Sequence, residues 1–574
     1  MKGMPNNNKG FVFILAILTI VLVMGMSAAF FYRGTAEKRF VDFEKYTIQA
    51  NFLSEAGANH GLAELRKRIR KDLNTVLNNS NNTARIASVL QNCYNSQAPL
   101  NLLTEAGFQV SGDQATFSVT PLTGDDFPTD IEGTYSSNIE ITASAGTNPV
   151  FIDSTVDAYV FYFDYIIEGT GSYNAVEPAI QKLNYLMGSF SVSVSLDHFA
   201  KYAVFTNKQK SGPGGQPVWF NSETNFQGPV HTNDEFSFAG NPSFGHEVTQ
   251  HQQEARYFND GDPVTIDDDH NGNIDVPAFA RDFERGIPMD ENNIESAFET
   301  ADFKKQALGK ANDNKIGVTV PVKGGAVTAG IYVNGDVQEF KLETIQDKGP
   351  SYTIRQDKDT TVVSVDYSAG AHGLTTVAVT ENTSGIITIN EYSGIPKGVD
   401  GEGIIIYCKD RIDNLSGRVY ETTKMTIVSE KDVVISNNVL YEGYQPSPLA
   451  ATGNNVLGII STKGNVRIGQ NAPNDIQIHG IVAAPHGVFT VDNYAQSVAK
   501  GTATLLGGAI TDYYGAFGTS SQGGQLQTGY ARNFVYDSRV LNGNIPPFFP
   551  RKDTFVSFES EELYDRPLWA NKME

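Results

Sequence analysis

The sequence predicts a mainly β protein that begins with one long α-helix. Charged residues make up only 19% of the chain, and 54 glycines lie among short runs of Thr, Val and Ile that are separated by Asn, Asp and Gly. That composition is typical of extracellular all-β proteins. An uncharged apolar stretch near the N-terminus predicts the helix. A chain of 574 residues is long enough for about two to four folded units.

The charge balance excludes one class of partner. The chain has 43 basic and 65 acidic residues, a net charge of -22, and an acidic surface repels phosphate backbones. We therefore expect no nucleic-acid binding. Cys93 and Cys408 are the only cysteines, so the chain has no Cys pair at metal-binding spacing. They form either one disulfide or two separate buried thiols.

Residues 11–32 carry no charge. As a helix they would be about 33 Å long, which is enough to cross the hydrocarbon core of a bilayer. Lys2 and Lys9 precede them, so the positive-inside rule keeps residues 1–10 in the cytoplasm. The sequence therefore predicts a single-pass membrane protein with an extracytoplasmic bulk.

The helix is predicted to continue as an amphipathic helix to about Lys71, because no proline occurs between Pro5 and Pro99. Apolar residues recur there at three- and four-residue steps, at Phe43, Tyr46, Ala50, Leu53 and Ala56. A stripe of small residues follows the same helix, at Ala50, Ser54, Gly57 and Gly61. Because a glycine inside a helix costs about 1 kcal/mol, the stripe indicates either close approach by another element or a soft spot in a solvated helix.

Two other interpretations of the N-terminus remain open. Ser27 and Ala29 have the spacing of small residues that signal peptidase requires, and an uncleaved segment would be a permanent anchor. The amphipathic continuation argues against a discarded signal, because a signal peptide has no such extension.

The stretches KGFVFILAILTIVLVMG and NFLSEAGANHGLAEL resemble the N-terminus of type IV pilin-like proteins, and most of all that of PilX-like minor pilins, through Glu55, Ala56 and Gly57. The resemblance covers about residues 1–75. It implies that a prepilin peptidase cleaves after Gly10 and that Phe11 becomes the new N-terminus. It also implies that residues 1–10 are a leader and that the helix, here residues 11–75, later packs in a filament.

The same resemblance implies other pilin subunits and an inner-membrane assembly machinery as partners. One departure limits it: Leu15 stands where major pilins carry a Glu that pairs with the N-terminal amine of a neighbour. A carboxylate in hydrocarbon is kept only where a partner awaits it. Leu15 therefore favours a rare or terminal subunit over a major one.

Residues 76–200 are predicted to form a pilin-like β head. A short helix is expected around Ile86–Leu90 after an Asn-rich connection. Strands of an antiparallel sheet are expected at 115–122, 138–146, 154–167 and 189–196, where β-branched and aromatic residues lie between turn residues.

Beyond the head we expect a β-rich module at 201–395, β-solenoid-like repeats at 396–550 and a C-terminal tail at 551–574. The repeats are apolar runs separated by polar turns, and we align them on Ile404, Ile427, Ile459, Ile481 and Ala509. Such periods fit a parallel β-solenoid with outward polar residues and insertions such as YEGYQPSPLAATGN. A β-sandwich is the alternative. This region also resembles a Gly-rich bacterial surface domain without an established activity.

One constellation indicates a metal site, within the acidic loop at 262–276. Oxygen-bearing side chains occupy every second position, at Asp267, Asp269, Asn271, Asn273 and Asp275. The pattern is similar to the start of calcium-binding loops. Ala278 stands where an EF-hand has its bidentate acid, so the choice is between a variant calcium site and a solvated acidic turn.

Little in the sequence indicates catalysis. His246 and His251 are five residues apart, whereas the zinc-protease motif needs four. Acidic pairs such as Asp410 with Asp413, or Asp432, are expected by chance among 65 acids. We therefore predict a filament subunit that displays its β module for assembly, capping or adhesion to a surface ligand, and not an enzyme. The alternative is a membrane-anchored, carbohydrate-active β-helix enzyme.

Overall fold

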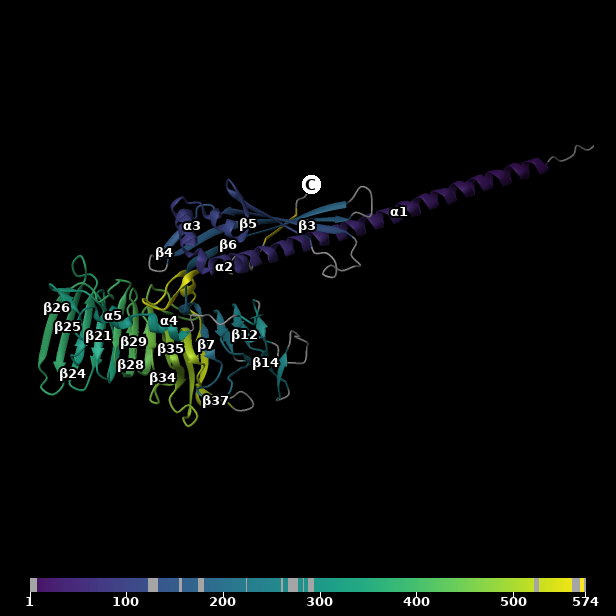
Figure 1. The fold of residues 1–574 in the computed structure, drawn as a ribbon. Helices are drawn as coiled ribbons and strands as arrows, with labels where there is room; N and C mark the ends of the chain where they lie inside the picture. Colours follow the sequence, from purple (N-terminus) through teal and green to yellow (C-terminus); the bar gives the residue numbers. More distant parts are fainter. Residues whose placement is uncertain are drawn as a thin grey trace, which may run out of the picture. The chain divides into compact units, whose positions relative to one another are not determined.

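The structure is a computed structural model that describes residues 8–121, 133–153, 157–173, 180–222, 224–259, 262–266, 277–281, 283–287, 294–520, 526–559 and 568–571. The chain forms two compact units. The first comprises residues 1–151, 160–193 and 557–574, and the second comprises 152–159 and 194–556. Helices and strands carry the labels of Figure 1.

The first unit begins with the predicted long helix. Helix α1 spans Asn8–Lys67 without a break, a π-helical turn follows at Arg68–Asp72, and α2 spans Leu73–Leu77. The predicted end near Lys71 therefore falls in the π-helical turn. Helix α3 (Thr83–Asn95), where a short helix was expected, lies between two 3-10 turns, Ser80–Asn82 and Pro99–Ala106.

An antiparallel sheet completes the first unit and confirms the predicted head strands. Its order is β1 (Gln109–Ser111), β2 (Gln114–Val119), β3 (Thr134–Ala143), β5 (Ala158–Tyr173), β6 (Ile180–His198) and β39 (Arg551–Glu559). Off this path, β4 (Val150–Asp153) pairs with β5, and β40 (Leu568–Asn571) pairs with β6. Residues 551–574, predicted as a tail, thus contribute two strands to the sheet.

Helix α1 packs on this sheet through glycines on both sides. A Cβ added to Gly57 would meet the Ser136 carbonyl oxygen at 2.8 Å, and one added to Gly169 of β5 would meet the Ala58 nitrogen at 2.6 Å. The small-residue stripe therefore marks close approach and not a soft spot. Within the predicted apolar stripe, Ala50 and Leu53 are buried, whereas Phe43 is 58% exposed.

The second unit contains a parallel β-solenoid. Ten strands pair in parallel, each with the next. They are β21 (Ile331–Asn334), β27 (Ile404–Cys408), β29 (Lys424–Ser429), β33 (Val456–Ser461), β35 (Gln477–Val491), β36 (Ala499–Tyr513), β7 (Val204–Lys208), β10 (Val230–Thr232), β13 (Val248–Gln250) and β17 (Phe283–Glu284). Parallel pairing confirms the solenoid and excludes the β-sandwich.

One inward side chain from each strand joins a continuous apolar ladder. Its members are Ile331, Ile406, Ile427, Ile459, Val482, Ala509, Val204, Val230, Val248 and Phe283. The predicted alignment was right at Ile427, Ile459 and Ala509. It was wrong at Ile404, which lies beside Met425, and at Ile481, which lies beside Gly458.

The stack does not follow the order of the chain. Ala509 of β36 pairs with Val204 of β7, so the first coils are added onto the last one. In Figure 1, β7 lies among the yellow-green strands of the C-terminal part of the chain, where it pairs with β36. The predicted modules 201–395 and 396–550 therefore form one stack, and no boundary falls at residue 395.

Further strands form the other sides of each coil. One wall contains β28 (Ile412–Val419), β30 (Val433–Tyr441), β34 (Val466–Ile468) and β38 (Leu526–Val535). The first coils use two short parallel sheets, β8 (Trp219–Phe220) with β11 (Ser237–Ala239) and β14 (Ala255–Asn259), and β9 (Asn225–Phe226) with β12 (Ser243–Phe244) and β16 (Ala278–Phe279). Buried Phe side chains fill the space between these walls.

Other strands extend the solenoid. An antiparallel meander, not predicted from the sequence, contains β22 (Glu339–Ile345), β23 (Gly349–Arg355), β24 (Asp359–Asp366), β25 (Leu374–Glu381) and β26 (Ile387–Ser393). The predicted insertion at 441–454 contains the hairpin β31 (Gln445–Pro446) and β32 (Leu449–Ala450). The remaining strands are β15 (Asp262–Ile266), β18 (Gly317–Thr319), β19 (Val322–Lys323), β20 (Ala326–Val327) and β37 (Gly518–Ser520).

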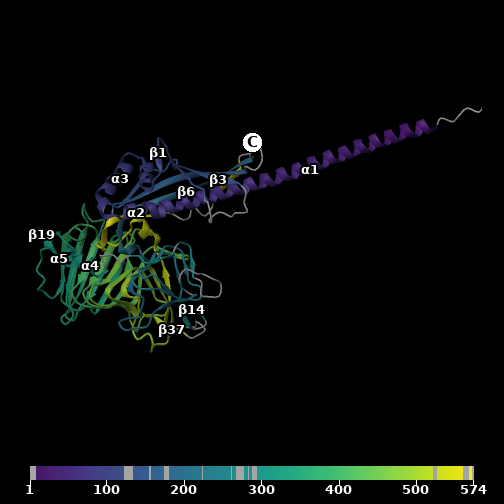
Figure 2. The same ribbon diagram turned by 45° about the vertical axis from the view of Figure 1, so that its right-hand side comes forward.

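The outer face of the central strands is also apolar, against the predicted alternation. Tyr332, Tyr407, Val428, Ile460, Ala483 and Ile510 form a second buried cluster with residues of α4 (Ile294–Thr300), α5 (Phe303–Leu308) and the segment 540–549. These elements cover the strands, so the face does not meet water; Figure 2 shows α4 and α5 on this module. A strand buried on both faces is apolar throughout.

Replacing Gly57 by Ala tests the contact between α1 and the sheet. Alanine is the better helix former by about 1 kcal/mol, but the added methyl group would press on a backbone carbonyl, and overpacking costs roughly 1–3 kcal/mol. We expect Gly57→Ala to destabilise the first unit, seen as faster amide exchange in β3 and β5. Gly34→Ala, in the same helix with open space around it, is the control, and equal exchange in both variants would contradict the prediction.

Candidate functional sites

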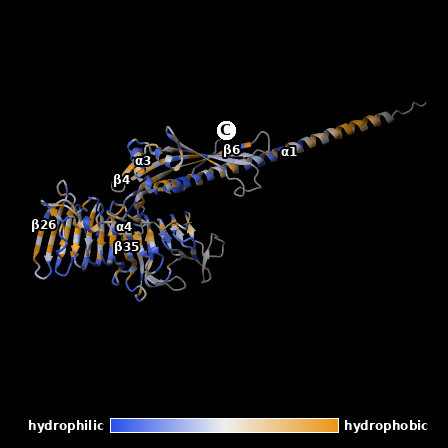
Figure 3. Ribbon diagram, viewed as in Figure 1, coloured by the Kyte–Doolittle hydropathy of each residue, from blue (hydrophilic) through white to orange (hydrophobic). Residues whose placement is uncertain are grey.

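The first candidate site is the N-terminal part of α1. Among the described residues, only this helix is long and apolar enough to span a membrane, and its most apolar 18-residue window, of mean hydropathy 2.7, has no buried residue. Figure 3 shows this stretch as the hydrophobic end of α1. Phe11 is 70% exposed and Leu15 is 56% exposed. The chain therefore has, near its N-terminus, one helix that is long and apolar enough to cross a membrane once.

The predicted cleavage point lies at the start of this helix. Gly10 lies in the first turn of α1, which begins at Asn8, where backbone N–H groups have no partner within the helix. Cleavage between Gly10 and Phe11 stays a prediction.

Apolar side chains remain exposed beyond the membrane segment. Phe40, Val41, Phe43, Ile48 and Phe52 are each more than half exposed. Phe43 belongs to the predicted apolar stripe of the amphipathic helix, but among the described side chains of α1 the first buried one is that of Ala50. This part of α1 therefore presents an apolar surface that nothing in the described residues of the first unit covers.

The predicted calcium ligands Asp267, Asp269, Asn271, Asn273 and Asp275 all lie outside the described residues. The antiparallel hairpin of β14 and β15 directly precedes them, and β15 ends at Ile266. No cluster of three or more His, Cys, Asp or Glu side chains suited to a metal occurs elsewhere in the described chain.

The two histidines of HEVTQH do not form a common site. The Glu247 backbone N–H donates to His246 Nδ1 at 2.9 Å, whereas His251 Nδ1 donates to the Ile287 carbonyl at 2.8 Å. Cys93 and Cys408 are two separate buried thiols, not a disulfide. Burial raises the pKa of Cys93 to about 11 and also raises that of Cys408, so both remain protonated at neutral pH.

The candidate acids on the solenoid are held in ion pairs. Asp410 accepts from Lys431 Nζ at 2.6 Å, Asp413 lies 3.2 Å from Arg411 Nε, and Asp432 lies 3.1 Å from an Arg467 amino group. Each of these three carboxylates therefore has a basic side chain as its ion-pair partner.

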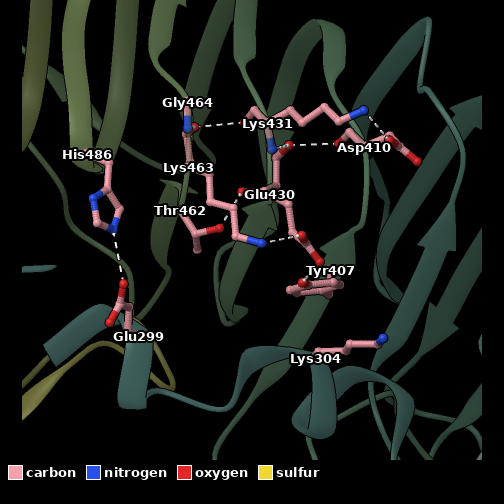
Figure 4. A network of polar contacts seen from close by, with 12 residues as sticks. Glu299, Lys304, Tyr407, Asp410, Glu430, Lys431, Thr462, Lys463, Gly464 and His486 are labelled. Carbon is pink, nitrogen blue, oxygen red and sulfur yellow. Dashed lines mark hydrogen bonds and ion pairs between the residues drawn. The ribbon is translucent and has the colours of Figure 1, made fainter. Parts of the chain in front are cut away.

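A cavity of about 430 Å³ lies where α4 and α5 meet the ends of three solenoid strands. Figure 4 shows its polar network. The Tyr407 hydroxyl donates to Glu430, and Lys463 Nζ donates to the same carboxylate at 2.8 Å. His486 Nε2 lies 3.6 Å from the Glu299 carboxylate. Sequence reasoning missed this cavity because its residues are far apart in the chain.

Burial and hydrogen bonding set the protonation of Tyr407 and Glu430. Burial and the Glu430 carboxylate raise the pKa of Tyr407. Burial opposes ionisation of Glu430, but hydrogen bonds from Lys463 and Tyr407 outweigh it and lower its pKa. At neutral pH the phenol is therefore protonated and the carboxylate is ionised, so the pair has neither an activated nucleophile nor a free base.

A second polar cluster, largely buried, lies at the end of β6 and the start of β39, in residues of these strands that belong to the second unit. Asp197 Oδ1 lies 2.7 Å from Lys201 Nζ, and Asp197 Oδ2 lies 3.5 Å from Lys552 Nζ. Burial opposes ionisation of Asp197, but the two ammonium groups outweigh it and hold its pKa at about 2. Neighbouring His198 is 0% exposed, and neither ring nitrogen has a partner among the described residues.

Comparison with known proteins gives one match. A family model described as a domain of unknown function, DUF4900, matches residues 159–252, from β5 to the end of β13. No curated protein and no solved structure matches.

The buried histidine predicts acid sensitivity. Burial, opposed by Asp197 and aided by Lys201 and Arg551, lowers the pKa of His198 to about 3. Between about pH 6.5 and pH 3 the unfolded chain therefore binds more protons than the folded chain, so stability falls as pH falls. We expect denaturant unfolding at pH 5 and pH 7 to show this loss.

The His198→Gln variant cannot take up that proton and should lose less stability over the same interval. His251→Gln, at a half-buried position, is the control and should behave as the unaltered protein. An equal pH response in His198→Gln and the control would contradict the assignment.

Proposed function

We propose that the chain is a minor, pilin-like subunit that starts in the membrane, enters a filament and displays a large β module outside the cell. One observation carries the proposal. Helix α1 is continuous from Asn8 to Lys67. Its N-terminal part is apolar and exposed, and the part from Ala50 onward packs on an antiparallel sheet. A plain membrane anchor needs only the first of these parts.

Two features of α1 favour assembly over permanent anchoring. The apolar residues at 40–52 lie beyond the predicted membrane segment, where water would meet them unless another subunit covers them. Leu15 supplies no carboxylate in the apolar part, and we propose that this restricts the subunit to a rare or terminal position. Other pilin subunits, the assembly machinery and a prepilin peptidase are the proposed partners.

The β module suits display. A solenoid is a rigid stack in which each coil contacts its neighbours, and such stacks present extended surfaces for binding. The groups in the Tyr407 cavity are saturated by one another, which favours a binding or capping role over catalysis. We therefore propose that the β module functions in adhesion or tip capping and has no enzymatic activity.

The native N-terminus tests the processing step. We expect mass spectrometry of the mature protein to find a chain that starts at Phe11. Gly10→Val should block this cleavage because the peptidase in pilin-like systems cleaves after Gly, whereas Gly25→Val, which meets nothing within 4 Å of its added Cβ, should still be processed. A start at Phe30 would indicate signal peptidase, and an intact Met1 would indicate an anchor; either contradicts the proposal.

Calcium binding by the acidic loop is part of the proposal. The hairpin of β14 and β15 delivers the loop from a paired strand, and its alternating oxygens suit a hard cation. We expect calorimetric titration of the full chain with Ca²⁺ to give heat that Asp267→Ala and Asp269→Ala abolish. Asp113→Ala, at the exposed turn between β1 and β2, is the control. Equal heats from all variants would contradict calcium binding at this loop.

A further inference from the structure

A second cavity, of about 670 Å³, lies at the opposite ends of the same solenoid strands. Its lining includes Ile404 at the start of β27, Lys424 at the start of β29 and Asn454 just before β33. Tyr367 and Lys397 come from the region of the meander, and segment 539–544 supplies the facing wall. The volume is in the range of cavities that hold small ligands.

The lining of this cavity is basic although the chain is acidic. Lys397, Lys424 and Arg539 line it, and Glu402 is the single acid among its described lining residues. The whole chain carries a net charge of -22. A local excess of cations on such a chain attracts anions.

The walls are held in place before any ligand arrives. Arg539 binds Asp537 through two of its nitrogens, one of them at 2.7 Å, and donates to the Gly453 carbonyl beside Asn454. Arg551 donates to Glu402 at 2.7 Å, which neutralises that acid. Such fixed walls lower the entropic cost of binding.

The remaining lining groups suit vicinal hydroxyl groups. Thr422, Asn454, Asn542 and Asn544 provide one hydroxyl and three amides, each of which can both donate and accept hydrogen bonds. Tyr367 adds an aromatic side chain whose hydroxyl is hydrogen-bonded to Thr423 Oγ1 at 2.8 Å. Because the adjoining strands β27, β29 and β33 are already paired on both sides, they offer no free edge to an extended peptide.

We propose that this cavity binds an acidic saccharide, with Lys397 and Lys424 contacting carboxylates of uronic-acid units and the three asparagines contacting ring hydroxyls. The proposal does not depend on whether the chain enters a filament.

Calorimetric titration of the detergent-solubilised full chain with trigalacturonate tests the proposal. Charge-assisted hydrogen bonds contribute enough that Lys397→Gln and Lys424→Gln should each weaken binding about tenfold. Asn542→Ala should weaken it less. Lys341→Gln, a matched loss of an exposed lysine on β22, should leave the affinity unchanged, and affinity should fall as salt is added.

Three comparison ligands show which chemical class of ligand the cavity binds. Galactotriose, which lacks the carboxylates, should bind at least tenfold more weakly; equal affinity would overturn the charge argument. Inorganic phosphate or an oligoglutamate peptide that binds as tightly as trigalacturonate would overturn the saccharide assignment. No measurable trigalacturonate binding, or binding that survives both lysine substitutions, would overturn the proposal while leaving the mature N-terminus at Phe11 unaffected.

Discussion

The second unit depends on one constraint: a coil of the solenoid can bury its inward side chains only against the next coil. The ladder from Ile331 to Phe283 meets this requirement without a gap, because each strand pairs in parallel with its neighbour. Both cavities are consequences of this stack. Each lies at strand ends, where a segment from elsewhere in the chain crosses the corner of the coils.

The order of the coils adds a second constraint. Because β7 pairs with β36, the coils formed by residues 204–284 join the rest of the stack through residues 509–513. Contacts of such long sequence separation are expensive in chain entropy and slow to form. The outer faces of β27, β29 and β33 likewise are buried by α4 and α5 and by the segment 540–549, two parts of the chain that are distant from each other in sequence.

The parts of this fold that could be predicted are those with local signals. The apolar, proline-free run predicted α1, and alternation with turn residues predicted the head sheet. Local signals failed where both faces of a strand are apolar: in IIIYC and VLGIIS, period-2 alternation is lost, so Ile404 was aligned two residues away from the ladder residue Ile406. The sequence could not show the permuted order, because the register of Ala509 with Val204 is set by tertiary packing.

The candidate sites follow the same rule. The apolar helix at 11–32 is a local feature of the sequence and was predicted correctly. Both cavities were missed, since Tyr407 and Glu299, or Lys424 and Arg539, are brought together only by crossing segments. Residues that the sequence did single out, such as Asp410 and Asp432, belong instead to ion pairs between neighbouring coils.

In the first unit, the decisive constraint is how closely α1 approaches the sheet. Glycines on both surfaces allow α1 to pack so closely that it cannot slide along the sheet. A Cβ on Gly171 would clash with the helix backbone at Ala50, and one on Gly57 would clash with β3. At the far end, Arg68 lies 3.4 Å from the centre of the Phe117 ring and donates to the Ala106 carbonyl at 2.9 Å. A shift of α1 by one turn would break both sets of contacts. These contacts fix the helix in one register on its sheet. Because α1 is continuous and packs closely against the sheet, a force applied to its exposed N-terminal part would be transmitted to the sheet directly and not through a flexible linker.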